Sequence, residues 1–174
     1  IYAQETNAAI RVAKRLPADY QKAAAAAQKL VRGEGGADKL YGGLSSDMRN
    51  AMGMKYALAR YYRINDKYDK ARAVLLSVPG DAEKMGDTDA WWVERRIVAR
   101  HSIGLDDPMS ARKAAYKIAA NSGVTDGDDA VEAEFLAGWI ALRFLNDPKT
   151  SLQHFQRLAA IAPSRTEKAR AGYW

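Results

Sequence analysis

A turn that contains aspartate recurs at a nearly constant interval along this chain. Asp66, Asp107 and Asp147 mark the three turns, and each follows a segment with helical spacing of apolar residues. The small residues early in the next helical segments stand at 71, 111 and 151, so their spacing is constant. A fixed period of about 40 residues is typical of helical repeat arrays, in which each unit buries its apolar surface against its neighbours.

The two halves of the last complete repeat differ in polarity. Between 133 and 145 only Glu134 and Arg143 are charged, which predicts a first helix that is buried among its neighbours. The second segment has apolar residues at three-to-four spacing and one polar face, as an outer helix does. From these patterns we expect five structural anchors: Gly138, Trp139, Phe155, Tyr62 and Ala71.

Composition favours helices throughout. Alanine is abundant, whereas the strand-favouring residues Val, Ile and Thr are sparse. The chain has no run of about 18 to 20 apolar residues, so we expect no membrane span. The absence of cysteine excludes a disulfide framework and thiol chemistry. The expected fold is all-α: a right-handed superhelix, or solenoid, of antiparallel helix pairs with a period of about 40 residues.

We expect one α-superhelical domain over residues 1–174, derived from a longer chain. The predicted parts are irregular helices with a Gly-rich loop over 1–46, helix-pair repeats over 47–79, 86–122 and 127–163, and the start of a further helix over 165–174. The predicted helices lie near 4–16, 19–33, 47–64, 67–77, 86–103, 109–121, 127–145, 149–161 and 165–174.

The helix pairs resemble tetratricopeptide repeats. The matching positions in one pair are Leu58, Ala59, Tyr62, Tyr68, Ala71 and Leu75. The period is longer than that of the tetratricopeptide repeat, which is about 34 residues. A closer resemblance lies in "DAWWVERRIVARHSIG", "AEFLAGWIALRFLNDPKTSLQHFQRLA" and "SRTEKARAGYW", which look like the superhelical region of soluble lytic murein transglycosylases. It is strongest from 89 to 174, fair from 47 to 79 and weak from 1 to 40.

This resemblance implies a function in the bacterial cell wall. In that family a signal peptide directs the enzyme to the periplasm, and a superhelical region precedes a lysozyme-like domain. That domain cleaves the glycan between N-acetylmuramic acid and N-acetylglucosamine and leaves a 1,6-anhydro end. The implied partners are glycan strands, the C-terminal domain of the same protein and other cell-wall proteins.

The family's catalytic motif is missing from this chain. Family members carry a catalytic Glu followed by Ser, and no Glu-Ser pair occurs here. We therefore expect a scaffold region that has no catalytic residue of its own and is inactive alone. The alternative is a free-standing tetratricopeptide-like adaptor that binds a peptide or a protein. Nucleic acid is not an expected partner, because the basic residues are dispersed and no recognition motif is present.

Aromatic and basic residues share one predicted helix. Trp91 and Trp92 precede Arg95, Arg96 and Arg100. Tryptophan beside arginine suits contact with a sugar or an anionic wall polymer. The same tryptophans equally suit anchors between repeats, with Glu94 paired to neighbouring arginines. Both interpretations remain open at the level of sequence.

Other polar groups give no cofactor or metal prediction. An acidic cluster begins at Asp126, but a calcium loop that starts there would place Val131 at its glycine position and Ala137 at its glutamate position. These acids are interpreted as the cap and first turn of a helix. His101 and His154 lack a second ligand at metal-binding spacing and are interpreted as structural or surface groups. The glycines over 33–36 lack the features of a phosphate loop.

Overall fold

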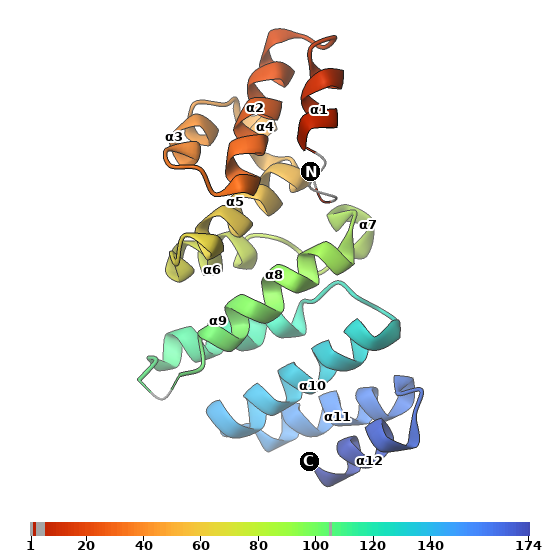
Figure 1. The fold of residues 1–174 in the computed structure, drawn as a ribbon. Helices are drawn as coiled ribbons and strands as arrows, with labels where there is room; N and C mark the ends of the chain where they lie inside the picture. The colour runs from red at the N-terminus through yellow and green to blue at the C-terminus, as the bar shows by residue number, and fades with distance from the viewer. Residues whose placement is uncertain (1, 3–5, 105) are drawn as a thin grey trace. The chain divides into compact units, whose positions relative to one another are not determined.

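The computed structural model describes residues 2, 6–104 and 106–174, and these residues form helices but no strand. The all-α prediction is therefore confirmed. In chain order the helices are α1 (Thr6–Ala13), α2 (Ala18–Arg32), α3 (Ala37–Gly42), α4 (Ser46–Asn50), α5 (Met52–Ile64), α6 (Tyr68–Leu76), α7 (Ala82–Met85), α8 (Thr88–His101), α9 (Met109–Ala120), α10 (Gly127–Phe144), α11 (Pro148–Ile161) and α12 (Arg165–Tyr173) (Figure 1).

The chain divides into two compact units, Ile1–Val78 and Pro79–Trp174. The sequence had predicted a single domain over 1–174. The boundary coincides with the end of the first predicted repeat, at 79. Each unit has its own buried apolar residues, and each is described by itself below.

The first unit is built around α2 and α5. Helix α2 packs against α1, α3 and α5, and α5 also contacts α6 (Figure 1). The alanine run in α2 favours a helix and leaves its buried face flat, so that α5 packs closely against it. The core consists of Ala26, Ala27, Leu30, Val31, Ala37, Met54, Ala57, Leu58 and Tyr61.

Gly33 ends α2 because the backbone there is left-handed. Its φ angle is 72°, and its amide donates to the carbonyl of Leu30. A Cβ atom at Gly33 would lie 2.6 Å from Cδ1 of Ile64, so a larger residue would also force that side chain to move. The amide of Asn65 fixes the same approach, because its Nδ2 donates to the carbonyls of Gly33 and Tyr61.

Helix α10 is the centre of the second unit. It contacts α8 and α9 on one side and α11 on the other, and α12 packs against α11 (Figure 1). Its apolar sequence from 133 to 145 accounts for this position, because both of its sides are covered. Helix α8 adds Trp91 and Trp92, which are fully buried.

Most predicted anchors lie in the interior. Ala71 and Phe155 are buried, as is Gly138, whose missing side chain brings α11 close to α10. A Cβ at Gly138 would lie 3.0 Å from Cβ of His154 and 3.1 Å from the ring of Phe155. Tyr62 is half-buried and packs against the core of the first unit.

Trp139 differs from the prediction. It was expected to be a core anchor, but its side chain is half-buried. Its ring meets the edge of Phe144, with 5.0 Å between centroids. The reason is helical geometry, since Gly138 faces α11 and the next residue lies about 100° further around the axis.

Two short helices, α4 and α7, were not predicted as such. The Gly-rich segment contains α3, and the helix expected over 47–64 is divided at Ala51, where ψ is 132°. Helix α7 precedes α8, and Asp81 caps it by accepting from the amide of Glu83. It ends at Gly86, where φ is 79°.

Candidate functional site

The two tryptophans expected to contact a ligand are enclosed in the second unit. Trp91 and Trp92 are both 0 % exposed. The indole of Trp91 donates to the carbonyl of Met85 over 3.1 Å, and the indole of Trp92 donates to Glu132 over 3.1 Å. Their faces cannot stack on a sugar, so the structure favours the packing interpretation and replaces the expectation of ligand contact.

Arg95 is enclosed as well. It is 0 % exposed and donates to the carbonyl oxygens of Pro79 and Asn121. Burial lowers its pKa to about 10, so it remains protonated at neutral pH. Its charge lies against the carboxyl end of α9, where the helix dipole favours a cation. Arg95 therefore joins the start of this unit to the end of α9 rather than binding a ligand.

Arg96 and Arg100 bind one carboxylate on α10. Nη1 of Arg96 lies 2.9 Å from Oε2 of Glu132, and Nη2 of Arg100 lies 2.6 Å from Oε1. Burial raises the pKa of Glu132, but the hydrogen bonds from both arginines outweigh it, so the pKa is lowered. Both arginines stay partly exposed, and they alone of the five predicted contact residues can reach a ligand.

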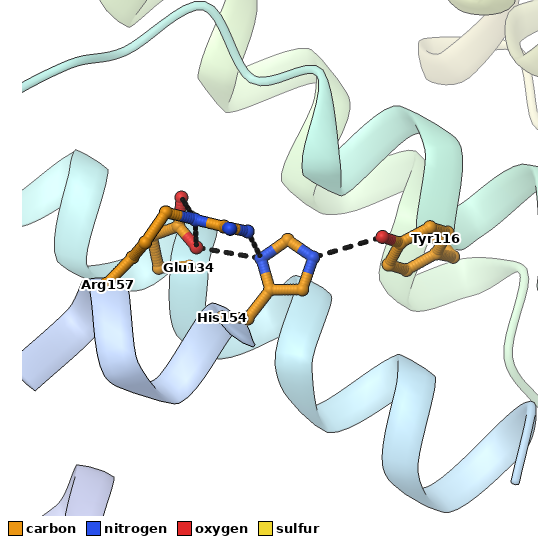
Figure 2. Close-up of polar contacts among 4 residues, drawn as sticks. All are labelled: Tyr116, Glu134, His154 and Arg157. Carbon is orange, nitrogen blue, oxygen red and sulfur yellow. Dashed lines mark hydrogen bonds and ion pairs between the residues drawn. The ribbon is translucent and has the colours of Figure 1, made fainter. Parts of the chain in front are cut away.

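A second polar network in this unit has His154 at its centre, and the sequence did not identify its other members. His154 on α11 lies between Glu134 on α10 and Tyr116 on α9 (Figure 2). Its Nδ1 is 2.7 Å from Oε2 of Glu134, and its Nε2 is 3.1 Å from the hydroxyl of Tyr116. Arg157, one turn further along α11, places Nε within 3.1 Å of both Glu134 oxygens.

Charge limits the hydrogen-bond directions in this network. Burial raises the pKa of Glu134, but His154 and Arg157 together lower it below its ordinary value. The ionised carboxylate only accepts and the guanidinium only donates, and both Oε2 of Glu134 and Nη2 of Arg157 lie 2.7 Å from Nδ1 of His154 (Figure 2). That nitrogen can therefore bond to only one of them at a time. Burial, with smaller effects of nearby charges, raises the pKa of Tyr116, so its hydroxyl keeps its proton.

The network borders a cavity of about 320 Å³ at one end of α10 and α11. Glu134 and Arg157 are its charged lining residues, and the others are Val124, Thr125, Ala130, Ala160 and Ile161. The carboxylate is bound on one side by His154 and on the other by Arg157. The arrangement links three helices and offers a paired charge to the cavity, not a free acid or base.

The sequence contained one signal for this network. Glu134 is a charged residue in the most apolar segment of the chain, and a buried charge there requires a partner. The interpretation of His154 as a structural or surface group identified neither Glu134 nor Tyr116 as that partner. These residues come from three helices, and their separations of 20 and 38 positions match no local motif.

The described residues show no metal centre and no spanning segment. No group of three or more His, Cys, Asp or Glu in these residues could hold a metal ion. The acidic cluster lies at the start of α10, with Asp128 and Asp129 in its first turn. Burial, reinforced by nearby acidic groups, raises the pKa of Asp129. None of the described helices is long and apolar enough to cross a membrane.

No family model, curated protein or solved structure matches this chain.

Proposed function

We propose that this chain is the helical scaffold region of a periplasmic lytic transglycosylase that cleaves peptidoglycan. In this proposal its helix pairs stack in a right-handed, tetratricopeptide-like superhelix with a period of about 40 residues. The region supports the enzyme's lysozyme-like domain and contacts glycan strands or other cell-wall proteins. The sequence resemblance described above supplies the enzyme class, and the packing of the helix pairs supports a scaffold.

One observation carries the proposal. Ala71, Ala111 and Ser151 occupy the same place in α6, α9 and α11, and all three are buried, with exposures of 0 %, 4 % and 2 %. Each belongs to the second helix of a pair, α5–α6, α8–α9 or α10–α11, whose members pack against each other. A small buried residue at a constant interval is the packing that a repeat array requires.

The polar groups support a scaffold rather than an active site. Glycoside cleavage needs a carboxylic acid that is protonated when the substrate binds. Glu132 and Glu134, two partly buried carboxylates, are held ionised by arginine and histidine partners, and the pKa of each is lowered. In this proposal the catalytic acid of the enzyme lies outside these 174 residues, because the Glu-Ser motif is absent from them.

The experiment compares this chain with the product of the complete reading frame that encodes it. Purified sacculi are digested with each protein, and the released muropeptides are separated by chromatography. We expect 1,6-anhydro products from the complete product and none from the 174-residue chain. If the complete product releases none, the enzyme assignment fails. If this chain alone releases them, the assignment as a scaffold fails.

A further inference from the structure

The first unit contains an apolar cavity of about 480 Å³. It lies between α1 and α2 and extends to α4 and the start of α5. Its lining includes Ala9, Val12 and Leu16 from the first helix and the turn after it, and Tyr20, Ala27 and Met54 from the others. This volume lies within the range of about 300–1,000 Å³ that is typical of small-molecule sites.

Large apolar side chains of this lining are open to solvent. Val12 is 64 % exposed, Leu16 is 43 % exposed and Tyr20 is 51 % exposed. They are contiguous across the turn that joins α1 to α2, and they form one apolar rim. Contiguous exposed apolar surface of this kind marks a binding site more often than a solvated face.

Three cations are close neighbours of the rim residues in the sequence. Arg11, Lys14 and Arg15 are exposed, and none of them has an acidic partner among the described residues. Arg11 and Arg15 directly precede the lining residues Val12 and Leu16. Residues 6–32 contain six basic residues and one acidic residue, so this segment carries a strong positive charge.

We propose that this cavity binds a single-chain anionic amphiphile, with the hydrocarbon chain in the cavity and the anionic head among Arg11, Lys14 and Arg15. A hydrocarbon chain needs no hydrogen-bond partner, and the lining offers almost none: Gln28, its one amide side chain, donates to Asn7. The unpaired cations supply the complementary charge for a carboxylate or a similar head.

Other occupants fit the cavity less well. An extended peptide would bring backbone N–H and C=O groups into an apolar lining that cannot bond them, which costs free energy for each group. An α-helix is about 10 Å across with its side chains, so it would cover the rim without filling the cavity. This inference does not rest on the proposed function.

The test is isothermal titration calorimetry of the whole chain with dodecanoate below its micellar concentration. We expect saturable binding of one molecule per chain. Dodecanol has the same hydrocarbon length as dodecanoate but no charge, and we expect it to bind about tenfold more weakly than dodecanoate. Hexanoate keeps the charge with a shorter chain and should bind more weakly still. Equal affinity for all three ligands, or no binding of dodecanoate, would overturn the proposal.

Variants locate the site. Leu16→Asp places a charge on the apolar rim and should reduce dodecanoate affinity by tenfold or more, as should Val12→Asp. The matched control is Leu152→Asp on α11, where the side chain is 57 % exposed and far from the lining in sequence. Circular dichroism checks that each variant is folded. If the control loses affinity as the rim variants do, the site is elsewhere.

Charge variants test the contribution of the anionic head separately from that of the hydrocarbon chain. Arg11→Glu with Arg15→Glu should weaken dodecanoate binding and leave dodecanol binding unchanged, whereas Lys113→Glu, an exposed lysine of α9, should change neither. Vesicles of anionic phospholipid and an acidic amphipathic peptide are tested with the same variants. Binding of vesicles or peptide without binding of dodecanoate monomers would assign this surface to a membrane or a protein and overturn the proposal.

Discussion

At the scale of single residues, burial distinguishes the tryptophans. Trp92 is 0 % exposed and hydrogen-bonded to Glu132, whereas Trp139 is half-buried against Phe144. We expect Trp92→Ala to lower the free energy of unfolding by about 3–5 kcal/mol, the usual cost of emptying a buried aromatic site. Trp139→Ala should cost about 1–3 kcal/mol, because less apolar area is lost. Urea denaturation measures both, and equal losses would contradict the difference in burial.

The Glu134 network predicts acid sensitivity. The pKa of Glu134 in the folded protein is lowered from 4.5, so its stabilisation is complete above the unfolded-state pKa and is lost as pH falls through the folded value. We expect the free energy of unfolding to decline below about pH 4.5. Glu134→Gln should lower it by about 1–3 kcal/mol at pH 7 and make the acid decline shallower.

Exposed Glu83 provides the matched control for this change. Glu83→Gln should leave both the stability at pH 7 and its acid decline close to those of the unchanged protein. Urea midpoints measured from pH 3 to 7 compare the acid decline of the two variants with that of the unchanged protein. An acid decline in Glu134→Gln as steep as that of the unchanged protein would show that other carboxyl groups cause it.

Sequence could identify the important residue types here but not their partners. Trp91 and Trp92 are adjacent, so their side chains leave α8 about 100° apart. Both side chains are buried only because other elements pack against both of these faces of α8. Periodicity within one helix does not show that a second face is covered. For the same reason Glu134 was noticed as a charge in an apolar helix, while its contact with His154 depended on the packing of α11.

At the scale of elements, the Asp-containing turns explain why the positions of several helices were predictable. Helix α10 was expected over 127–145 and spans Gly127–Phe144, and α11 begins after Asp147, which caps it by accepting from the amide of Thr150. The break at Ala51 was not predictable. Alanine is the strongest helix former, and the nearest glycine, Gly53, lies two residues later inside α5, so no residue at the break itself opposed a continuous helix.

The contact between α10 and α11 depends on the missing side chain at Gly138. In a free helix Gly→Ala gains about 1 kcal/mol. Here a Cβ would lie 3.0 Å from Cβ of His154, an atom fixed close to the backbone of α11. We expect overpacking to exceed the helical gain, so that Gly138→Ala destabilises the protein by about 1–2 kcal/mol in thermal unfolding.

Gly172 of α12 is the matched control for this substitution. A Cβ there would meet no atom within 4 Å, so Gly172→Ala should stabilise the protein slightly through helix propensity alone. Opposite signs for the two alanine variants would demonstrate that close helix approach, and not glycine flexibility, is required at 138. A stabilising Gly138→Ala would show that α11 can move away from α10 without cost.

At the scale of the whole molecule, the two compact units make separate unfolding testable. All four tryptophans lie in Pro79–Trp174, so tryptophan fluorescence reports on the second unit, while far-ultraviolet circular dichroism reports on both. Leu30 is 0 % exposed in the core of the first unit, and Leu30→Ala should cost that unit about 2–5 kcal/mol. Because each unit has its own core, we expect an earlier urea transition by circular dichroism and an unchanged fluorescence midpoint. A fluorescence midpoint that shifts together with the dichroism would show that the 174 residues unfold as one cooperative body.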